Sequence, residues 1–368
     1  MSNSSRSPFR QEATLEELAG VGRNRRFDEI IDDEGLLDLQ VICRRGEEEI
    51  PLANPSRAIY FGDRGLYNQE ANRFVETEKA RILNTAEFSH NLTVFNDLKL
   101  SCQRGFVIPF VGAGMSKTAG CPTWAEYLLD LCVEARRDPE TMRVRLEEKG
   151  DYEGVMDDLV RDLGENRFNR NFKRDFKTQD DITGAVTVLP RLFDGSAITT
   201  NFDRVLEKAY ENASTPFIEK VTGRGNANMF FRALPAGDRY LLRLHGYLDN
   251  AAERILNKAE YDVAYGNDGV IDFERPLPKL LRRLFTSYSF LFIGCSLSAD
   301  RTVQTFMRVV RDEGADNLPS HYALLPCPAD PERRHLFDQR LADALISPLW
   351  DPEGSHEHVE QILELLLE

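Results

Sequence analysis

Several features that would assign a chemistry at once are missing from this 368-residue chain. Its six cysteines are scattered and none forms a CxxC pair, which argues against a tetrathiolate zinc site and favours reduced, mostly buried thiols. No apolar run approaches the roughly 18 residues that cross a bilayer, and the polar start lacks the hydrophobic centre of a signal peptide. We therefore expect a cytoplasmic protein.

Net positive charge is also lacking. The formal net charge is -15, which repels a phosphate backbone over the surface as a whole. Direct binding of nucleic acid is therefore not expected of this chain alone. With 42% hydrophobic and 29% charged residues, the composition is that of an ordinary globular protein, and the length allows two or three domains.

The first 97 residues have a character of their own. A polar start of about 14 residues is expected to be disordered, residues 36–52 suggest a β-hairpin that turns near Arg45 and Gly46, and residues 69–85 have helical spacing with dense charge. Nothing in this region looks catalytic. We predict an N-terminal accessory or assembly region, while a simple extension packed on the main domain explains the pattern equally well.

Residues 98–368 alternate between short apolar runs and amphipathic segments. This pattern predicts an α/β fold, a Rossmann-like doubly wound parallel sheet covered on both faces. The predicted strands are residues 106–111, 196–200, 240–245, 289–293, 321–325 and 344–347. The predicted helices include residues 124–136, 203–210, 300–312, 331–341 and 356–367.

Residues 139–193 contain no good strand candidate and predict a helical subdomain inserted into the sheet. Within it, Phe168, Phe172 and Phe176 recur at intervals of four, interleaved with arginines and lysines. Basic residues with interleaved aromatics can mark nucleic-acid contact. The three rings share one helix face, however, so we favour a core stripe with a solvated basic back.

The stretch FVIPFVGAGMSKTAGCPTW, residues 106–124, is a strand followed by a glycine turn and a helix. A backbone without side chains at Gly112 and Gly114 can approach a pyrophosphate, and the N–H groups of the turn and helix favour an anion. The Rossmann pattern GxGxxG is broken by Lys117, so this turn alone indicates nucleotide binding only in general terms.

Two further strands end in polar residues. In ITTNFD, Asp203 suits the N-cap of the next helix, whereas Asn201 has no such local duty and its amide can orient a water and a ribose hydroxyl. In RLHGYLDN, His245 is followed by a glycine and is well placed for general-base work. The HEHVE segment near the C-terminus lacks the HExxH spacing of a zinc helix, and we expect no metal.

A third strand end, FLFIGCSLSADRTV, places Ser296 and Ser298 after Gly294. Ser298 can cap the following helix, with Asp300 favouring its positive end. Ser296 can bond a ribose or serve as a plain turn residue. In a parallel sheet all these junctions can line one cleft at the carboxyl edge.

Together, GAGMS, TTNFD, HG and GCSL, in this order and each after a strand, resemble the sirtuin (silent information regulator) superfamily, and most closely its bacterial anti-phage defence branch. The resemblance covers about three quarters of the chain, from Leu98 onward. It implies an NAD site built from the glycine turn and the later strand ends, with Asn201 and His245 as the catalytic pair. The NAD-binding residues implied are Gly112, Ala113, Gly114, Ser116, Thr200, Asp203, Gly294, Cys295 and Ser296.

The resemblance implies an NAD hydrolase that yields ADP-ribose and nicotinamide without a metal, as the effector of a defence system. It further implies homo-oligomers and a partner such as a HerA-type ATPase. Two alternatives remain open, an NAD-dependent protein deacylase and a non-enzymatic sensor or scaffold that binds NAD or ADP-ribose. The deacylase is weakened because this chain lacks the paired-cysteine zinc ribbon, and Ala125 stands where deacylases have an arginine.

Overall fold

The computed structural model describes residues 23–33, 42–45, 48–51, 55–147, 150–178, 181–250, 252–298, 300–351 and 356–367. Its contacts divide the chain into two compact units, Met1–Ile82 and Leu83–Glu368. The sequence placed this division at residue 97 instead. The polar start, residues 1–14, lies outside the described residues.

The smaller unit is a helical cluster with one hairpin. It contains α2 (Arg25–Asp32), β1 (Ile42–Arg45), β2 (Glu48–Pro51), α3 (Pro55–Gly62) and α4 (Arg64–Ile82). The antiparallel pairing of β1 with β2 confirms the predicted hairpin, and α4 begins five residues before the predicted helix. Aromatic side chains form its core, where the Tyr67 hydroxyl donates to the buried carboxylate of Asp28 at 2.8 Å.

The first α-helix of the larger unit is α5 (Asn91–Gln103), and the domain boundary predicted at residue 97 falls inside it. The buried Asn91 side chain bonds the backbone of Trp350 twice, donating to its carbonyl at 2.7 Å and accepting from its N–H at 3.1 Å. Residues 83–97 therefore pack with the last strand of the sheet, which explains why the contact boundary lies at Ile82.

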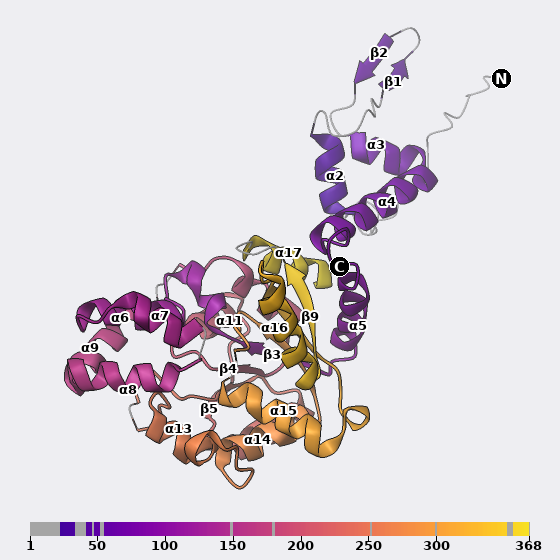
Figure 1. Ribbon diagram of the computed structural model, residues 1–368. Coiled ribbons are helices and arrows are strands. Elements are labelled where there is room, and N and C mark those ends of the chain that lie inside the picture. Colours follow the sequence, from indigo (N-terminus) through magenta and orange to yellow (C-terminus); the bar gives the residue numbers. More distant parts are fainter. Residues whose placement is uncertain are drawn as a thin grey trace, which may run out of the picture. The chain divides into compact units, whose positions relative to one another are not determined.

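Seven parallel strands form the sheet of the larger unit, in the order β5-β6-β4-β3-β7-β8-β9 (Figure 1). Their bounds are β3 (Val107–Val111), β4 (Ala197–Thr199), β5 (Glu219–Thr222), β6 (Tyr240–Arg243), β7 (Ser289–Ile293), β8 (His321–Pro326) and β9 (Ile346–Asp351). From the central β3 the chain passes to β4, then to the edge strand β5 and back to β6 between them, before it crosses to β7 on the other side of β3. The predicted doubly wound fold is confirmed, and its switch point lies at the carboxyl ends of β3 and β7.

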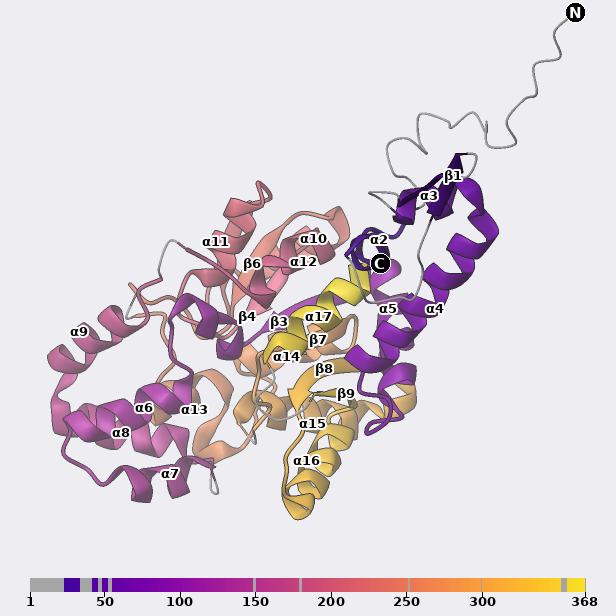
Figure 2. The same cartoon turned by 90° about the horizontal axis from the view of Figure 1, so that it is seen from above.

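Helices cover both faces of this sheet. Figure 1 shows α17 (His356–Leu367) on one side of the sheet, with α14 (Pro276–Phe285) and α15 (Arg301–Glu313) on the other. Further helices of this unit are α10 (Leu189–Leu192), α11 (Val205–Asn212), α12 (Ala227–Ala236), α13 (Lys258–Tyr265) and α16 (Pro331–Asp343). Figure 2 shows the same arrangement from above.

The predicted strands are all present, but two details differ. The last strand begins at Ile346 rather than at residue 344, because Leu345 has a φ of 55° and belongs to the preceding turn. The edge strand β5 was missed, since only Val221 and Thr222 of its four residues are buried and its sequence is too polar for a recognisable strand.

Between β3 and β4, the described residues contain helices joined by loops and no strand. The helical module consists of α6 (Trp124–Glu134), α7 (Pro139–Glu147), α8 (Tyr152–Leu163) and α9 (Glu165–Asp175). Phe168, Phe172 and Phe176 are buried in its core, which confirms the core stripe. The basic residues between them lie on the exposed back of α9, where Arg167 pairs with Glu134.

In the described part of the chain, no helix combines the length and the apolar character that crossing a membrane requires. The cysteines whose side chains are described are all free: Cys102, Cys121, Cys132, Cys295 and Cys327.

Candidate functional site

The loops that follow β3, β4, β6 and β7 meet at one edge of the sheet. Val111 is paired with Thr199 on one side and with Ile293 on the other, and Thr199 is paired with Arg243. Gly112 and Gly294 thus lie one residue beyond this paired row. Asn201 and His245 each lie two residues beyond it, on neighbouring strands, so the register brings the predicted catalytic pair to the same level.

The glycine turn packs against the loop after β7. A Cβ atom on Gly112 would lie 2.5 Å from the carbonyl oxygen of Gly294, and one on Gly114 would lie 2.9 Å from the Gly294 Cα. The Gly114 N–H donates to the same carbonyl at 2.9 Å. The approach of a pyrophosphate is thus not needed to explain these glycines, because contact between the two loops already requires them.

The helix after the glycine turn is a 3₁₀ helix, η1 (Ala113–Ala119), rather than the start of a long α-helix. It ends at Gly120, whose φ of 79° reverses the chain. The α-helix α6 then begins separately, and Thr123 and Glu126 form a capping box at its N-terminus. The turn therefore places Ser116, which is buried, inside the loop cluster rather than on an α-helix end.

Asn201 is buried at the centre of the cluster. Its Nδ2 donates to the Gly112 carbonyl at 3.0 Å and to the Ser116 hydroxyl at 3.2 Å. Ser116 also bonds the buried carboxyl of Asp203, whose pKa is raised by burial. Asn201 does not cap the following helix, and its amide instead joins the loop after β4 to the glycine turn.

Asp203 is not the N-cap of α11. That position belongs to Arg204, whose side chain makes no capping bond, and Asp203 instead accepts from the Val205 N–H at 2.9 Å. Its carboxylate thus shapes the turn between Asn201 and the helix. Thr200, which directly precedes Asn201, is half-buried at the same edge.

Arg243, the last residue of β6, fixes the position of the Asn201 loop. Its guanidinium donates to the backbone carbonyls of Asn201 and Asp203 and pairs with Glu207, and both ion-pair side chains are almost completely buried. Sequence reasoning did not single out this residue. The available signal was an arginine inside an otherwise apolar strand, YLLRL.

His245 is 9% exposed, and its Nε2 lies 3.0 Å from the Tyr265 hydroxyl. That hydroxyl lies 3.0 Å from Oγ1 of Thr302, in the first turn of α15. Burial, aided by the positive charge of Arg224, lowers the pKa of His245 to about 4. The imidazole is therefore neutral at pH 7 and is connected through Tyr265 to the helix that follows the β7 loop.

This pKa predicts how stability depends on pH. Between about pH 6.5 and pH 4 the unfolded chain takes up a proton at His245 and the folded chain does not, so the free energy of unfolding falls as the pH falls. We expect His245→Gln to reduce the loss of stability between pH 7 and pH 5 by about 2 kcal/mol, measured by urea unfolding. His335→Gln, at an exposed position of α16, is the control and should unfold with the wild-type pH dependence. An unchanged pH dependence in His245→Gln would contradict the assignment.

The loop after β7 contains Gly294, Cys295 and Ser296. The Cys295 thiol donates to the Phe110 carbonyl at 3.4 Å, and burial raises its pKa, so it remains a protonated packing group. Ser296 is exposed and lies 3.2 Å from Ser298. Asp300, rather than Ser298, caps α15 by accepting from the N–H groups of Thr302 and Val303.

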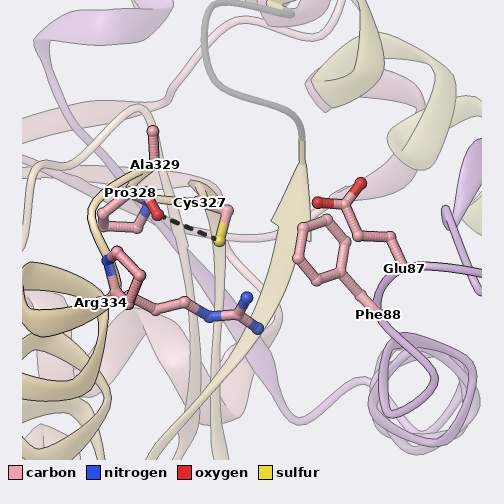
Figure 3. A pocket seen from close by; sticks show the side chains of 7 residues that line it. Glu87, Phe88, Cys327, Pro328, Ala329 and Arg334 are labelled. Carbon is pink, nitrogen blue, oxygen red and sulfur yellow. Dashed lines mark hydrogen bonds between the residues drawn. The ribbon is translucent and has the colours of Figure 1, made fainter.

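No three histidine, cysteine, aspartate or glutamate side chains among the described residues are grouped as a metal ion would require. A small hollow of about 280 Å³ opens elsewhere, beyond the carboxyl end of β8 (Figure 3). There the Arg334 guanidinium lies 5.2 Å from the ring centre of Phe88, beside Cys327 and Glu87. None of the predicted site residues lines it.

The chain is similar in sequence to a known domain family and to several characterised proteins. Residues 195–348 match the SIR2-like domain, a match that covers β4 to β8 and confirms the sirtuin resemblance. The chain is also similar to the NAD(+) hydrolase ThsA of Enterococcus faecium, with 24% identity over 231 residues, 61% of this chain and 44% of the relative. The ThsA of Bacillus cereus strain MSX-D12 is 26% identical over 218 residues, 59% of this chain and 42% of the relative. The chain therefore matches less than half the length of these relatives.

Proposed function

We propose that this chain hydrolyses NAD⁺ to ADP-ribose and nicotinamide. The observation that carries the proposal is the placement of Asn201 and a neutral His245 at the same level of one sheet edge, beside the glycine turn. The similarity to proteins named NAD(+) hydrolase supports the same reaction.

In the proposed reaction, water attacks the anomeric carbon of the nicotinamide ribose. The bond from this carbon to nicotinamide breaks, and its electron pair leaves with nicotinamide. Since Nδ2 of Asn201 is committed to the Gly112 carbonyl and Ser116, Oδ1 is the atom that orients the water or a ribose hydroxyl.

The proton released by the water passes to His245 in this proposal. For Nδ1 to accept it, Nε2 must carry a hydrogen and donate to Tyr265, whose own hydrogen then points to Thr302. Both distances, 3.0 Å each, allow this arrangement. Tyr265 is thus a positioning residue that holds the imidazole in the tautomer able to act as a base.

A direct test is to mix the purified chain with NAD⁺ and measure nicotinamide by chromatography, with and without the product of a neighbouring gene. Nicotinamide should appear in at least one of these mixtures. Release that requires an acyl-lysine peptide would identify a deacylase instead. Saturable binding of NAD⁺ without turnover in every mixture would identify a sensor or scaffold.

We further propose that the activity belongs to an anti-phage effector that depletes the cytoplasmic NAD pool. Such an enzyme needs control, because constant turnover would harm its own cell. Homo-oligomers formed through the N-terminal unit, and a partner such as a HerA-type ATPase, are the proposed means of control. A rise in turnover of about tenfold on mixing with the partner would support this arrangement.

A further inference from the structure

A hollow of about 460 Å³ lies between the end of the helical module and the loops after β4 and β6. We call it the α9–α11 hollow, and none of the predicted site residues lines it. Phe202 and Tyr247 nevertheless place it close to the site, because Phe202 follows Asn201 and Tyr247 lies two residues beyond His245. Its lining residues are Phe176, Lys177, Thr178, Phe202, Arg204, Lys208, Tyr247, Leu248, Asp249 and Asn250.

The lining is positively charged, although the chain has a net charge of -15. Lys177, Arg204 and Lys208 reach the hollow from two elements that are distant in sequence. The single acidic lining residue, Asp249, is paired with Lys173 at 3.3 Å. Arg204 lies 3.4 Å from Glu211, but both side chains are about half exposed, so this pair is weak. The hollow therefore favours an anion.

Three aromatic residues also line the hollow. The buried rings of Phe176 and Phe202 are 6.5 Å apart in an edge-to-face arrangement, and Tyr247 lines the hollow from the loop after β6. Lysines and arginines beside flat apolar rings suit a ligand that has a phosphate and a planar base. The hollow beside Cys327 differs, because it is smaller and is lined by one cation and one carboxylate.

We propose that the α9–α11 hollow binds a nucleoside monophosphate group, with the phosphate held by Lys177, Arg204 and Lys208 and the base against the half-buried ring of Tyr247. The volume lies within the range of small-molecule sites. The Arg204 N–H donates to the Thr178 hydroxyl at 2.6 Å, which joins the end of α9 to the loop of Asn201. A bound nucleotide would strengthen this connection between the helical module and the candidate site.

The test is calorimetric titration of the full chain with AMP, adenosine and inorganic phosphate. AMP should bind, and adenosine and phosphate should each bind about tenfold more weakly or worse, because each retains only half of the contacts. Lys177→Glu combined with Arg204→Glu should weaken AMP binding at least about tenfold, and Lys208→Gln should weaken it in the same direction. Arg170→Glu, exposed on α9 but outside the lining, is the control and should bind AMP as the wild type does.

Three results would overturn the proposal: no binding of AMP at millimolar concentration, equal affinity in the charge-reversed variant, or an equal loss in Arg170→Glu. Displacement of AMP by saturating NAD⁺ would also overturn it, because the two ligands would then share the main cleft. These readouts do not depend on NAD⁺ turnover, so the proposed hydrolase activity can fail without affecting them.

Discussion

Replacing Asn201 by alanine should lower the rate of NAD⁺ hydrolysis by about two to three orders of magnitude, the usual cost of removing a group that orients a reacting water or stabilises developing charge. The variant loses the proposed acceptor Oδ1 and the bonds from Nδ2 to the Gly112 carbonyl and Ser116. The measurement is nicotinamide release at saturating NAD⁺, together with thermal unfolding to confirm that the variant is folded.

Two further variants separate chemistry from loop packing. Ser116→Ala removes one partner of the Asn201 amide and keeps the amide itself, so its rate should fall much less. Asn212→Ala, exposed at the end of α11, should leave the rate unchanged. If Asn201→Ala turns over NAD⁺ at a rate near that of the wild type, Asn201 is not the orienting residue.

The sheet could be predicted from the sequence because its central strands are short apolar runs that end in glycine or polar residues. In β3 and β7 every residue is buried, and this gives an unmistakable pattern. The edge strand β5 gives no such signal, since Glu219 is exposed and Lys220 is only half-buried. A strand that is buried on both faces can be recognised from its apolar sequence, whereas a strand of which only half is buried cannot.

Of the candidate site, the sequence predicted the proposed catalytic residues but not the residues that support them. Asn201 and His245 could be found because they stand directly after strands, where parallel sheets expose functional groups. Their supporting residues come from elsewhere in the chain: Tyr265 lies at the end of α13, a helix the sequence analysis did not identify, and Thr302 lies in α15. Such partners depend on how helices pack, which strand spacing does not encode.

Arg243→Met should destabilise the fold by about 3–5 kcal/mol, because it leaves the carboxylate of Glu207 buried without its partner. The guanidinium and carboxylate side chains are 1% and 2% exposed, so water cannot replace either charge. Glu207→Leu should be similarly costly, since it leaves the guanidinium unpaired. Urea unfolding of both single variants measures these losses.

The double variant, Arg243→Met with Glu207→Leu, should recover most of the lost stability. Replacing both members of a buried ion pair by apolar residues of similar volume is often neutral or stabilising. Arg243 and Glu207 act on the pKa of the neighbouring Asp203 in opposite directions, so removing both partly offsets the effect of removing Arg243 alone. A double variant as unstable as Arg243→Met would show that the backbone contacts of the guanidinium, rather than its charge pairing, stabilise the fold.

Activity should not recover with stability. Arg243 donates at 2.7 Å to the carbonyl of Asn201 and also bonds that of Asp203, and methionine supplies neither bond. The loop that holds Asn201 then loses its position relative to His245, so kcat should fall by at least about tenfold while KM changes less, since a displacement of about 1 Å can cost a hundredfold in rate. Recovery of stability and kcat together would show that Arg243 serves the fold alone. Recovery of stability alone would show that this buried ion pair is retained because it positions the loop of the proposed catalytic asparagine.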